Sequence, residues 1–198
     1  MAFAEPPKLT FPPEVAERVR AAYAAAETIL EYGSGGSTLL AAELGRRCVS
    51  VESDGAWATA MRNWIARAHP EAPVRIHRAY IGSTKAWGRP RSSLRWLRYP
   101  LFWRYPRSVW SLPGFAHPDV ILIDGRFRLA CFLTALTKIR RPTKVLWDDY
   151  KTRPAYALAE RYAKPTAVVG RMAEFEITPR PFSAGELWAL RQALFDPE

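Results

Sequence analysis

The chain has 198 residues, 48% of them hydrophobic, which is enough to bury one substantial core, so a single domain over residues 1–198 is expected. The formal net charge of +10 favours anionic partners, with nucleic acid among the possibilities, but does not choose between them. No stretch approaches the roughly 18 apolar residues of a membrane span, so no transmembrane segment is expected. The N-terminus does not resemble a signal peptide, so we expect a cytoplasmic location.

Amphipathic segments with apolar residues three or four positions apart alternate along the chain with short apolar runs, which predicts helices alternating with strands. The expected helices cover residues 12–27, 38–44, a stretch beginning at about 54, 129–136 and 154–162. The expected strands cover residues 28–32, 47–52, 74–79, 119–124, 144–147, 167–170 and 174–178. This order predicts an α/β, doubly wound, Rossmann-like sheet of seven mostly parallel strands, with helices on both faces and an antiparallel edge strand.

A glycine-rich turn joins the first strand to the next helix, and its residues are Gly33, Ser34, Gly35, Gly36 and Ser37. Open parallel sheets bind ligands beyond the carboxyl ends of their strands. Glycines in such a turn can adopt positive φ and let a ligand approach the main chain, while the start of the helix offers free N–H groups. The turn therefore predicts a nucleotide-type ligand.

Two carboxylates flank this turn. Glu31 lies at the end of an apolar strand, where its burial requires a cationic or hydrogen-bonding partner such as an ammonium group. Glu52 closes the second strand about 20 residues later, where a carboxylate can accept both hydrogen bonds of a ribose diol, and Ser53 is assigned to the same site. A pyrophosphate would be repelled by Glu31, which disfavours a dinucleotide-binding oxidoreductase, the main alternative.

At these residues the chain resembles the class I S-adenosylmethionine-dependent methyltransferases, whose first motif is an acidic residue, any residue and then spaced glycines. Residues 31–37 match this motif, except that Ser37 stands where many members carry a third glycine, which leaves the helix packing there open. The resemblance spans about residues 12–180. It implies S-adenosylmethionine as the cofactor, with Glu31 near its methionine end, the first glycines under it and Glu52 on its ribose.

Three further carboxylates are expected at the same edge of the sheet, Asp124 after the fourth strand and Asp148 and Asp149 after the fifth. Asp124 and Asp149 are the candidate catalytic residues, as a base or hydrogen-bonding partner for the acceptor. All three are also candidate ligands for magnesium or calcium, which prefer oxygen donors. The arrangement loosely resembles the metal-dependent O-methyltransferases, although Gly125 and Arg126 follow Asp124 where that group carries a second acid and a lysine.

A structural interpretation of this rim stays open, because the carboxylates could instead cap helices or pair with Arg126, Arg128 and Arg153. Arg126, Tyr150 and Arg153 are the candidate substrate-binding residues, suited to an anionic or hydroxylated acceptor. Cysteines and histidines are scattered without ligand-like spacing, so no disulfide or zinc site is expected.

The alternation of elements stops between Gly82 and Pro118, in an insertion that is rich in basic and aromatic residues and contains no acidic residue. The basic residues are Lys85, Arg89, Arg91, Arg95, Arg98, Arg104 and Arg107, interleaved with the aromatic residues Trp87, Trp96, Tyr99, Phe102, Trp103, Tyr105 and Trp110. The insertion is interpreted as a lid or a binding surface for nucleic acid, acidic glycan or lipid, or alternatively as a partly buried loop or dimer contact.

The favoured function is S-adenosylmethionine-dependent O-methylation of a small-molecule or saccharide acceptor. Few catalytic residues are expected, because the sulfonium is already activated and the enzyme mainly aligns the reactants. A nucleic-acid methyltransferase is an alternative that the charge favours, although the Asn/Asp-Pro-Pro-aromatic motif of amino-methylating enzymes is missing. A non-catalytic binding module that kept the cofactor fold is the other alternative.

Overall fold

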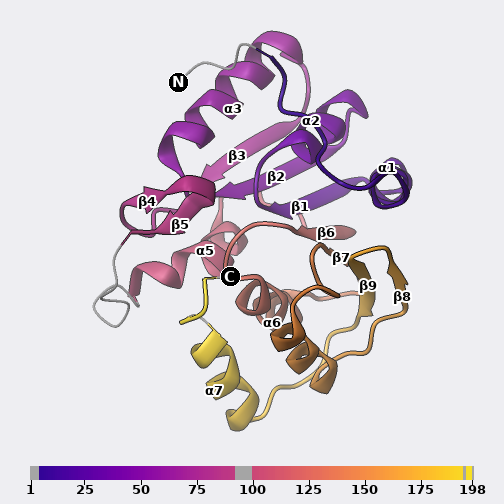
Figure 1. Cartoon of the computed structure of the whole chain (residues 1–198), viewed down its shortest axis with the longest axis vertical. Helices are drawn as coiled ribbons and strands as arrows, with labels where there is room; N and C mark the ends of the chain where they lie inside the picture. The colour runs from indigo at the N-terminus through magenta and orange to yellow at the C-terminus, as the bar shows by residue number, and fades with distance from the viewer. Residues whose placement is uncertain (1–4, 92–99, 194, 198) are drawn as a thin grey trace.

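A computed structural model describes residues 5–91, 100–193 and 195–197 of the chain. It confirms the expected seven-stranded sheet, with the strand order β3-β2-β1-β6-β7-β9-β8 (Figure 1). The strands are β1 (Thr28–Tyr32), β2 (Arg47–Glu52), β3 (Val74–Arg78), β6 (Val120–Ile123), β7 (Thr143–Trp147), β8 (Ala167–Val169) and β9 (Met172–Ile177). The first five of these run parallel, and β9 is antiparallel to both β7 and β8, so the antiparallel pairing lies at the expected end of the sheet.

Helices cover both faces of the sheet (Figure 1). One face packs against α1 (Pro13–Ala25), α2 (Gly36–Glu43) and α3 (Gly55–Ala68). The other packs against α5 (Arg104–Arg107), η2 (Ser108–Ser111), α6 (Arg128–Lys138), η3 (Pro154–Arg161) and α7 (Ala184–Ala193). Side chains alternate between the two faces along each strand, so that Ile29 joins the core under α1 while Leu30 joins the core under α6.

The helix α7 was not expected from the sequence. Its start carries the capping-box pattern, in which the Ser183 N–H donates to Glu186 Oε2 at 2.8 Å and the Glu186 N–H donates to Ser183 Oγ at 3.3 Å. This Ser-x-x-Glu spacing is visible in the sequence and could have predicted the helix. Among the described residues, no helix has the length and apolar character needed to cross a membrane.

The insertion contains two different kinds of structure. Its first part is a small hairpin of β4 (Thr84–Lys85), η1 (Ala86–Gly88) and β5 (Arg89–Pro90). Its second part enters the core, where Phe102, Tyr105 and Val109 are almost fully buried, so for this part the buried-loop alternative is the one that holds. Residues 92–99, which include Arg95, Trp96, Arg98 and Tyr99, lie outside the described residues.

Candidate functional site

A cavity of about 700 Å³ opens at the carboxyl edge of the sheet, where β1, β2 and β6 end. Its walls come from the glycine turn, the first turn of α3, the β4–β5 hairpin and the N-terminal segment 7–11. Among the residues assigned to the cofactor, those that line it are Gly33, Ser34, Gly35, Gly36, Ser37, Glu52 and Ser53. The sequence assignments therefore converge on one cavity, with Glu31 as the exception.

The glycines of the turn are required for different physical reasons. Gly33 has φ +106° and lies so close to the end of β6 that a Cβ would stand 2.8 Å from the main chain of Gly125. A Cβ at Gly36 would stand 2.5 Å from the main chain of Leu9, because segment 7–11 crosses over the turn. A Cβ at Gly35 would meet no protein atom within 4 Å. Gly35 is thus the position where the missing side chain leaves room for a ligand.

Glu52 is the buried carboxylate of the cavity, with only 8% of its surface exposed. Its Oε1 accepts hydrogen bonds from the N–H groups of Ser53, at 2.6 Å, and Asp54, at 2.8 Å. Within the described part of the chain, its Oε2 accepts one long hydrogen bond, of 3.4 Å, from the Ser34 N–H. Burial raises the pKa of Glu52, and the backbone N–H donors oppose that rise. One carboxylate oxygen is therefore fixed in place, and the other has capacity for a ligand donor.

Glu31 does not line the cavity and differs in this respect from the sequence-based expectation. Its side chain accepts hydrogen bonds of 2.6 Å from the hydroxyls of Tyr23, on α1, and Thr38, on α2. The carboxylate is fully buried, and burial raises its pKa against the effect of these donors. The partners that burial of this carboxylate requires are thus hydroxyl groups, including those of Tyr23 and Thr38, and Glu31 links α1 and α2 to β1.

The acidic rim is organised by one buried arginine, Arg128, at the start of α6. Its guanidinium donates to the carbonyl oxygens of Gly125, at 3.0 Å, and Asp148, at 2.6 Å. It also lies 3.1 Å from Asp124 Oδ1 and 3.2 Å from Asp149 Oδ2. Arg128 therefore ties the end of β6 to the end of β7, and the arginine-pairing alternative describes this rim.

Asp148 is held by Arg171 in a bidentate ion pair, with distances of 2.8 Å and 2.7 Å between the nitrogens and the two carboxylate oxygens. Asp149 contacts Arg128, Arg153 and Arg171. Within the described ranges, no three acidic, histidine or cysteine side chains are grouped so that they could hold a metal ion. The described residues therefore lend no support to the predicted magnesium or calcium site, because its carboxylates are paired with arginines.

Asp124 lines the cavity and keeps 30% of its side-chain surface exposed. Desolvation raises its pKa to about 7, against the opposing charge of Arg128 and with the support of the neighbouring charges of Asp148 and Asp149. Arg126, which is 8% exposed, lines the cavity beside it. A carboxyl group with this pKa can accept a proton near neutral pH, which suits a general base.

The other two predicted substrate-binding residues do not line this cavity. Tyr150 packs edge-on against Trp147, with ring centroids 5.3 Å apart, and its hydroxyl donates to Glu160 at 3.2 Å. Burial raises the pKa of Tyr150. Arg153 lies 3.4 Å from Asp149 and 5.8 Å from the Tyr156 ring centroid. Both residues belong to the packing around η3.

Aromatic residues also line the cavity, although none of them was assigned to the cofactor site from the sequence, and two of them come from the insertion. The indole of Trp57 donates to the Ser34 carbonyl oxygen at 2.8 Å and so braces the turn. The Tyr105 hydroxyl accepts a 3.3 Å hydrogen bond from the Arg126 N–H. Trp87, at the tip of the hairpin, is 85% exposed with φ +64°. Strained backbone conformations of this kind cluster at active sites and ligand clamps.

The comparison with solved structures finds a methyltransferase-like protein from Silicibacter pomeroyi that is 44% identical, with a TM-score of 0.91, covering 97% of this chain and 99% of that one. The chain is also similar in fold to an O-methyltransferase from Bacillus cereus in complex with S-adenosylhomocysteine, at 18% identity and a TM-score of 0.53, with 85% and 82% of the two chains covered.

A similar fold is found in an RNA methyltransferase from Salinibacter ruber in complex with S-adenosyl-L-homocysteine, at 15% identity and a TM-score of 0.51, with 89% and 97% covered. No family model and no curated protein sequence matches the chain. At these low identities, the Bacillus and Salinibacter proteins support the fold only, whereas the Silicibacter protein supports the family.

Proposed function

This chain belongs to the class I S-adenosylmethionine-dependent methyltransferase family, and we propose that it binds S-adenosylmethionine in the cavity at the glycine turn and methylates a hydroxyl oxygen of a small-molecule or saccharide acceptor. The observation that carries the proposal is that Glu52 and Asp124 line the same cavity. Gly35 lines it too, at a position where a side chain would project into open space. The carboxylate proposed to bind the cofactor and the carboxylate proposed to accept the proton thus line the same cavity.

The cavity suits an adenosine-bearing cation in size and in the chemistry of its walls. A volume of about 700 Å³ lies within the roughly 300–1,000 Å³ of ligand pockets. Glu52 offers Oε2 to the ribose hydroxyls while its Oε1 stays bound to the main chain. Aromatic rings of Trp57 and Trp87 provide apolar surface at the same cavity. These features support the cofactor that the family implies.

On the acceptor side, Asp124 takes the hydroxyl proton while Arg128 holds its carboxylate in place. When bound, S-adenosylmethionine supplies an activated methyl group whose bonding electrons leave with sulfur. Arg126 lines the same wall and lies where it can contact a hydroxylated or anionic acceptor. Asp149 contributes by positioning Arg128, from 3.2 Å, and not by touching the acceptor.

The test is methyl transfer from S-adenosylmethionine to a panel of hydroxylated small molecules and saccharides, with amine and thiol acceptors beside them, followed by mass spectrometry of the products. We expect O-methylated products with the wild type and a rate at least about a hundredfold lower with Asp124→Asn, because loss of a general base costs about 10²–10⁴-fold. Products methylated on nitrogen or sulfur, or an undiminished rate in Asp124→Asn, would contradict the proposal.

A further inference from the structure

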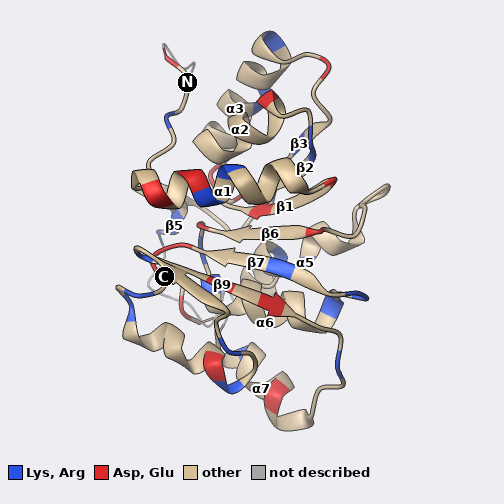
Figure 2. Cartoon of the chain, turned by 90° about the vertical axis from the view of Figure 1, so that its right-hand side faces the viewer, with Lys and Arg blue, Asp and Glu red and all other residues tan. Residues whose placement is uncertain are grey.

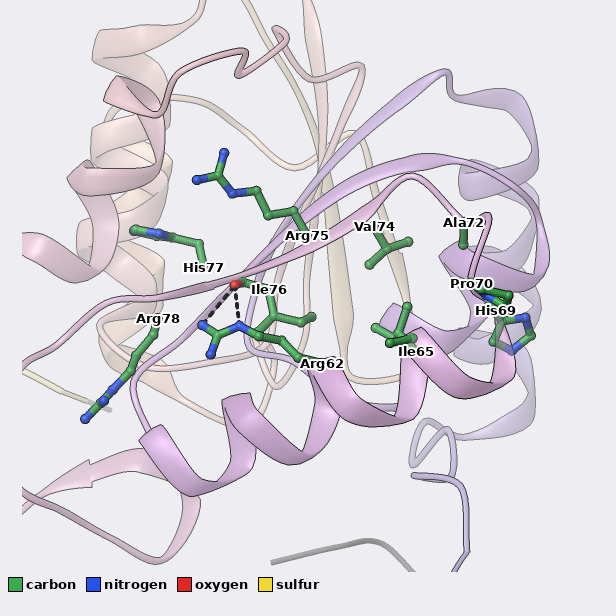
Figure 3. A pocket seen from close by; sticks show the side chains of 11 residues that line it. Arg62, Ile65, His69, Pro70, Ala72, Val74, Arg75, Ile76, His77 and Arg78 are labelled. Atoms are coloured by element: carbon green, nitrogen blue, oxygen red, sulfur yellow. Dashed lines mark hydrogen bonds between the residues drawn. The ribbon is translucent and has the colours of Figure 1, made fainter.

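A cavity separate from the cofactor site, of about 610 Å³, lies along the edge strand β3 and is here called the edge cavity. Arg62 reaches it from α3 and donates to the Ile76 carbonyl oxygen at 3.1 Å and 3.2 Å, while Arg75 and Arg78 project from β3 (Figure 3). His69 also lines it. The described residues that form this lining include no carboxylate.

A second basic cavity, of about 770 Å³, lies at the amino ends of β1 and β2 and is here called the end cavity. Its lining includes Arg46, Arg47, Arg140 and Arg141. The acidic residue in this lining is Glu27. Nearby, Asp119 is neutralised by its ion pair with Arg141 and by hydrogen bonds from two backbone N–H groups.

The two cavities meet at the start of β3. Ala72 and Val74 line the edge cavity, and Pro73 between them lines the end cavity. Arg75 donates to the Pro113 carbonyl oxygen at 3.3 Å, so the edge cavity also approaches the segment that carries Ala116 of the end cavity. Basic residues therefore line both cavities on either side of Pro73, and Figure 2 colours the basic positions of the chain blue.

This basic lining leads toward the cofactor cavity. Arg78 closes β3 at the carboxyl edge of the sheet, and its guanidinium lies so near Gly55 that a Cβ there would stand 2.6 Å from it. Gly55 follows Asp54, which lines the cofactor cavity. The five residues of β3 alone span about 16 Å at roughly 3.3 Å per residue. The basic lining is thus longer than a single small anion requires.

We propose that the edge cavity and the end cavity together bind the phosphate backbone of a single-stranded polynucleotide. Guanidinium groups pair well with phosphate oxygens, and arginines spaced along a path match an anion whose charges repeat. A flexible single strand can bend at Pro73 from one cavity into the other. This binding extends beyond the proposed function and does not depend on what the methyl acceptor is.

Other anionic partners fit less well. A small anion would be held by donors converging on one point, whereas here they are divided between two cavities that meet at Pro73. A lipid surface binds through protruding basic residues beside an exposed apolar face. Here Arg62 and Arg78 lie on the α3 side of β3 and Arg75 on its other side, so the arginines are spread around the edge strand and do not form one flat face.

The test measures fluorescence anisotropy of a short labelled single-stranded RNA, with single-stranded DNA of the same sequence in a parallel arm, across a series of salt concentrations. We expect saturable binding that weakens steeply with salt. Arg75→Glu combined with Arg78→Glu should lower the affinity at least about tenfold and reduce the slope of log K against log salt by about two, roughly one per lost phosphate contact.

The matched control is Lys151→Glu combined with Arg161→Glu, which makes the same change in charge at exposed residues outside both cavities. This control should keep most of the affinity. The absence of binding to both strands at low salt would overturn the proposal, and so would an equal loss in the two double variants or binding confined to anionic lipid vesicles. S-adenosylhomocysteine titration of the same proteins reports on the cofactor site separately, so failure of one proposal is distinguishable from failure of the other.

Discussion

The carboxylate of Glu31 accepts a 2.6 Å hydrogen bond from the hydroxyl of Thr38. This bond links Glu31, near the end of β1, to the first turn of α2. The acidic residue at this motif position therefore supports the conformation of the glycine turn, because its carboxylate is already bound by the hydroxyls of Tyr23 and Thr38.

Replacement of Glu31 should consequently reduce stability. We expect Glu31→Ala to lower the free energy of unfolding by about 2–4 kcal/mol, because two buried hydroxyls lose their acceptor and a cavity forms. Urea denaturation measures this change. An unchanged midpoint together with a lost affinity for S-adenosylhomocysteine would show instead that Glu31 touches the ligand.

The neighbouring glycines allow a matched pair of substitutions. Gly36→Ala places its Cβ 2.5 Å from the main chain of Leu9, so we expect an overpacking cost of about 1–3 kcal/mol in the free energy of unfolding. Gly35→Ala meets no protein atom within 4 Å and has extended backbone, so its stability should be retained. Its added methyl group should instead weaken S-adenosylhomocysteine binding, which thermal denaturation with and without ligand will detect. Equal losses of stability in the two variants would contradict this assignment.

The pH dependence of methyl transfer should report on Asp124. Its pKa is raised to about 7, and a base acts in its ionised form, so kcat/KM should fall as the pH drops through about 7 and reach a plateau above it. Asp124→Asn should remove this step from the profile. His77→Gln should keep it, because that imidazole is bonded to Ser108 outside the cofactor cavity. A step that survives in Asp124→Asn would assign the titration to another group.

Divalent cations should leave the protein unchanged. We expect the same melting temperature with a chelator, with magnesium and with calcium, because arginines already neutralise the carboxylates of the rim. Asp148→Asn should lower the free energy of unfolding by about 1–3 kcal/mol, since it breaks a bidentate pair whose Arg171 partner keeps some solvent contact. A cation-induced rise in melting temperature that Asp148→Asn abolishes would restore the metal site.

The alternation of helices and strands was predicted well from local sequence patterns, because apolar runs indicate the strands and turn residues indicate where they end. The position of Glu52 followed from strand spacing alone, since the end of β2 must reach the same edge as the glycine turn. Pairing between distant residues was not predictable in this way. Asp148 meets Arg171 only because the antiparallel register aligns Trp147 with Ala173, and Tyr105 reaches the main chain of Arg126 through the folding of the insertion.

The most direct test of the central claim is calorimetric titration with S-adenosylhomocysteine of the wild type and Glu52→Gln. The glutamine keeps an oxygen for the N–H groups of Ser53 and Asp54 but loses the second carboxylate oxygen, so the fold should be retained. We predict binding by the wild type and an affinity about 10- to 100-fold lower in Glu52→Gln, from the loss of hydrogen bonds to a charged group worth about 1.5–3 kcal/mol. Failure of the wild type to bind, or equal affinities in the two proteins, would contradict the account.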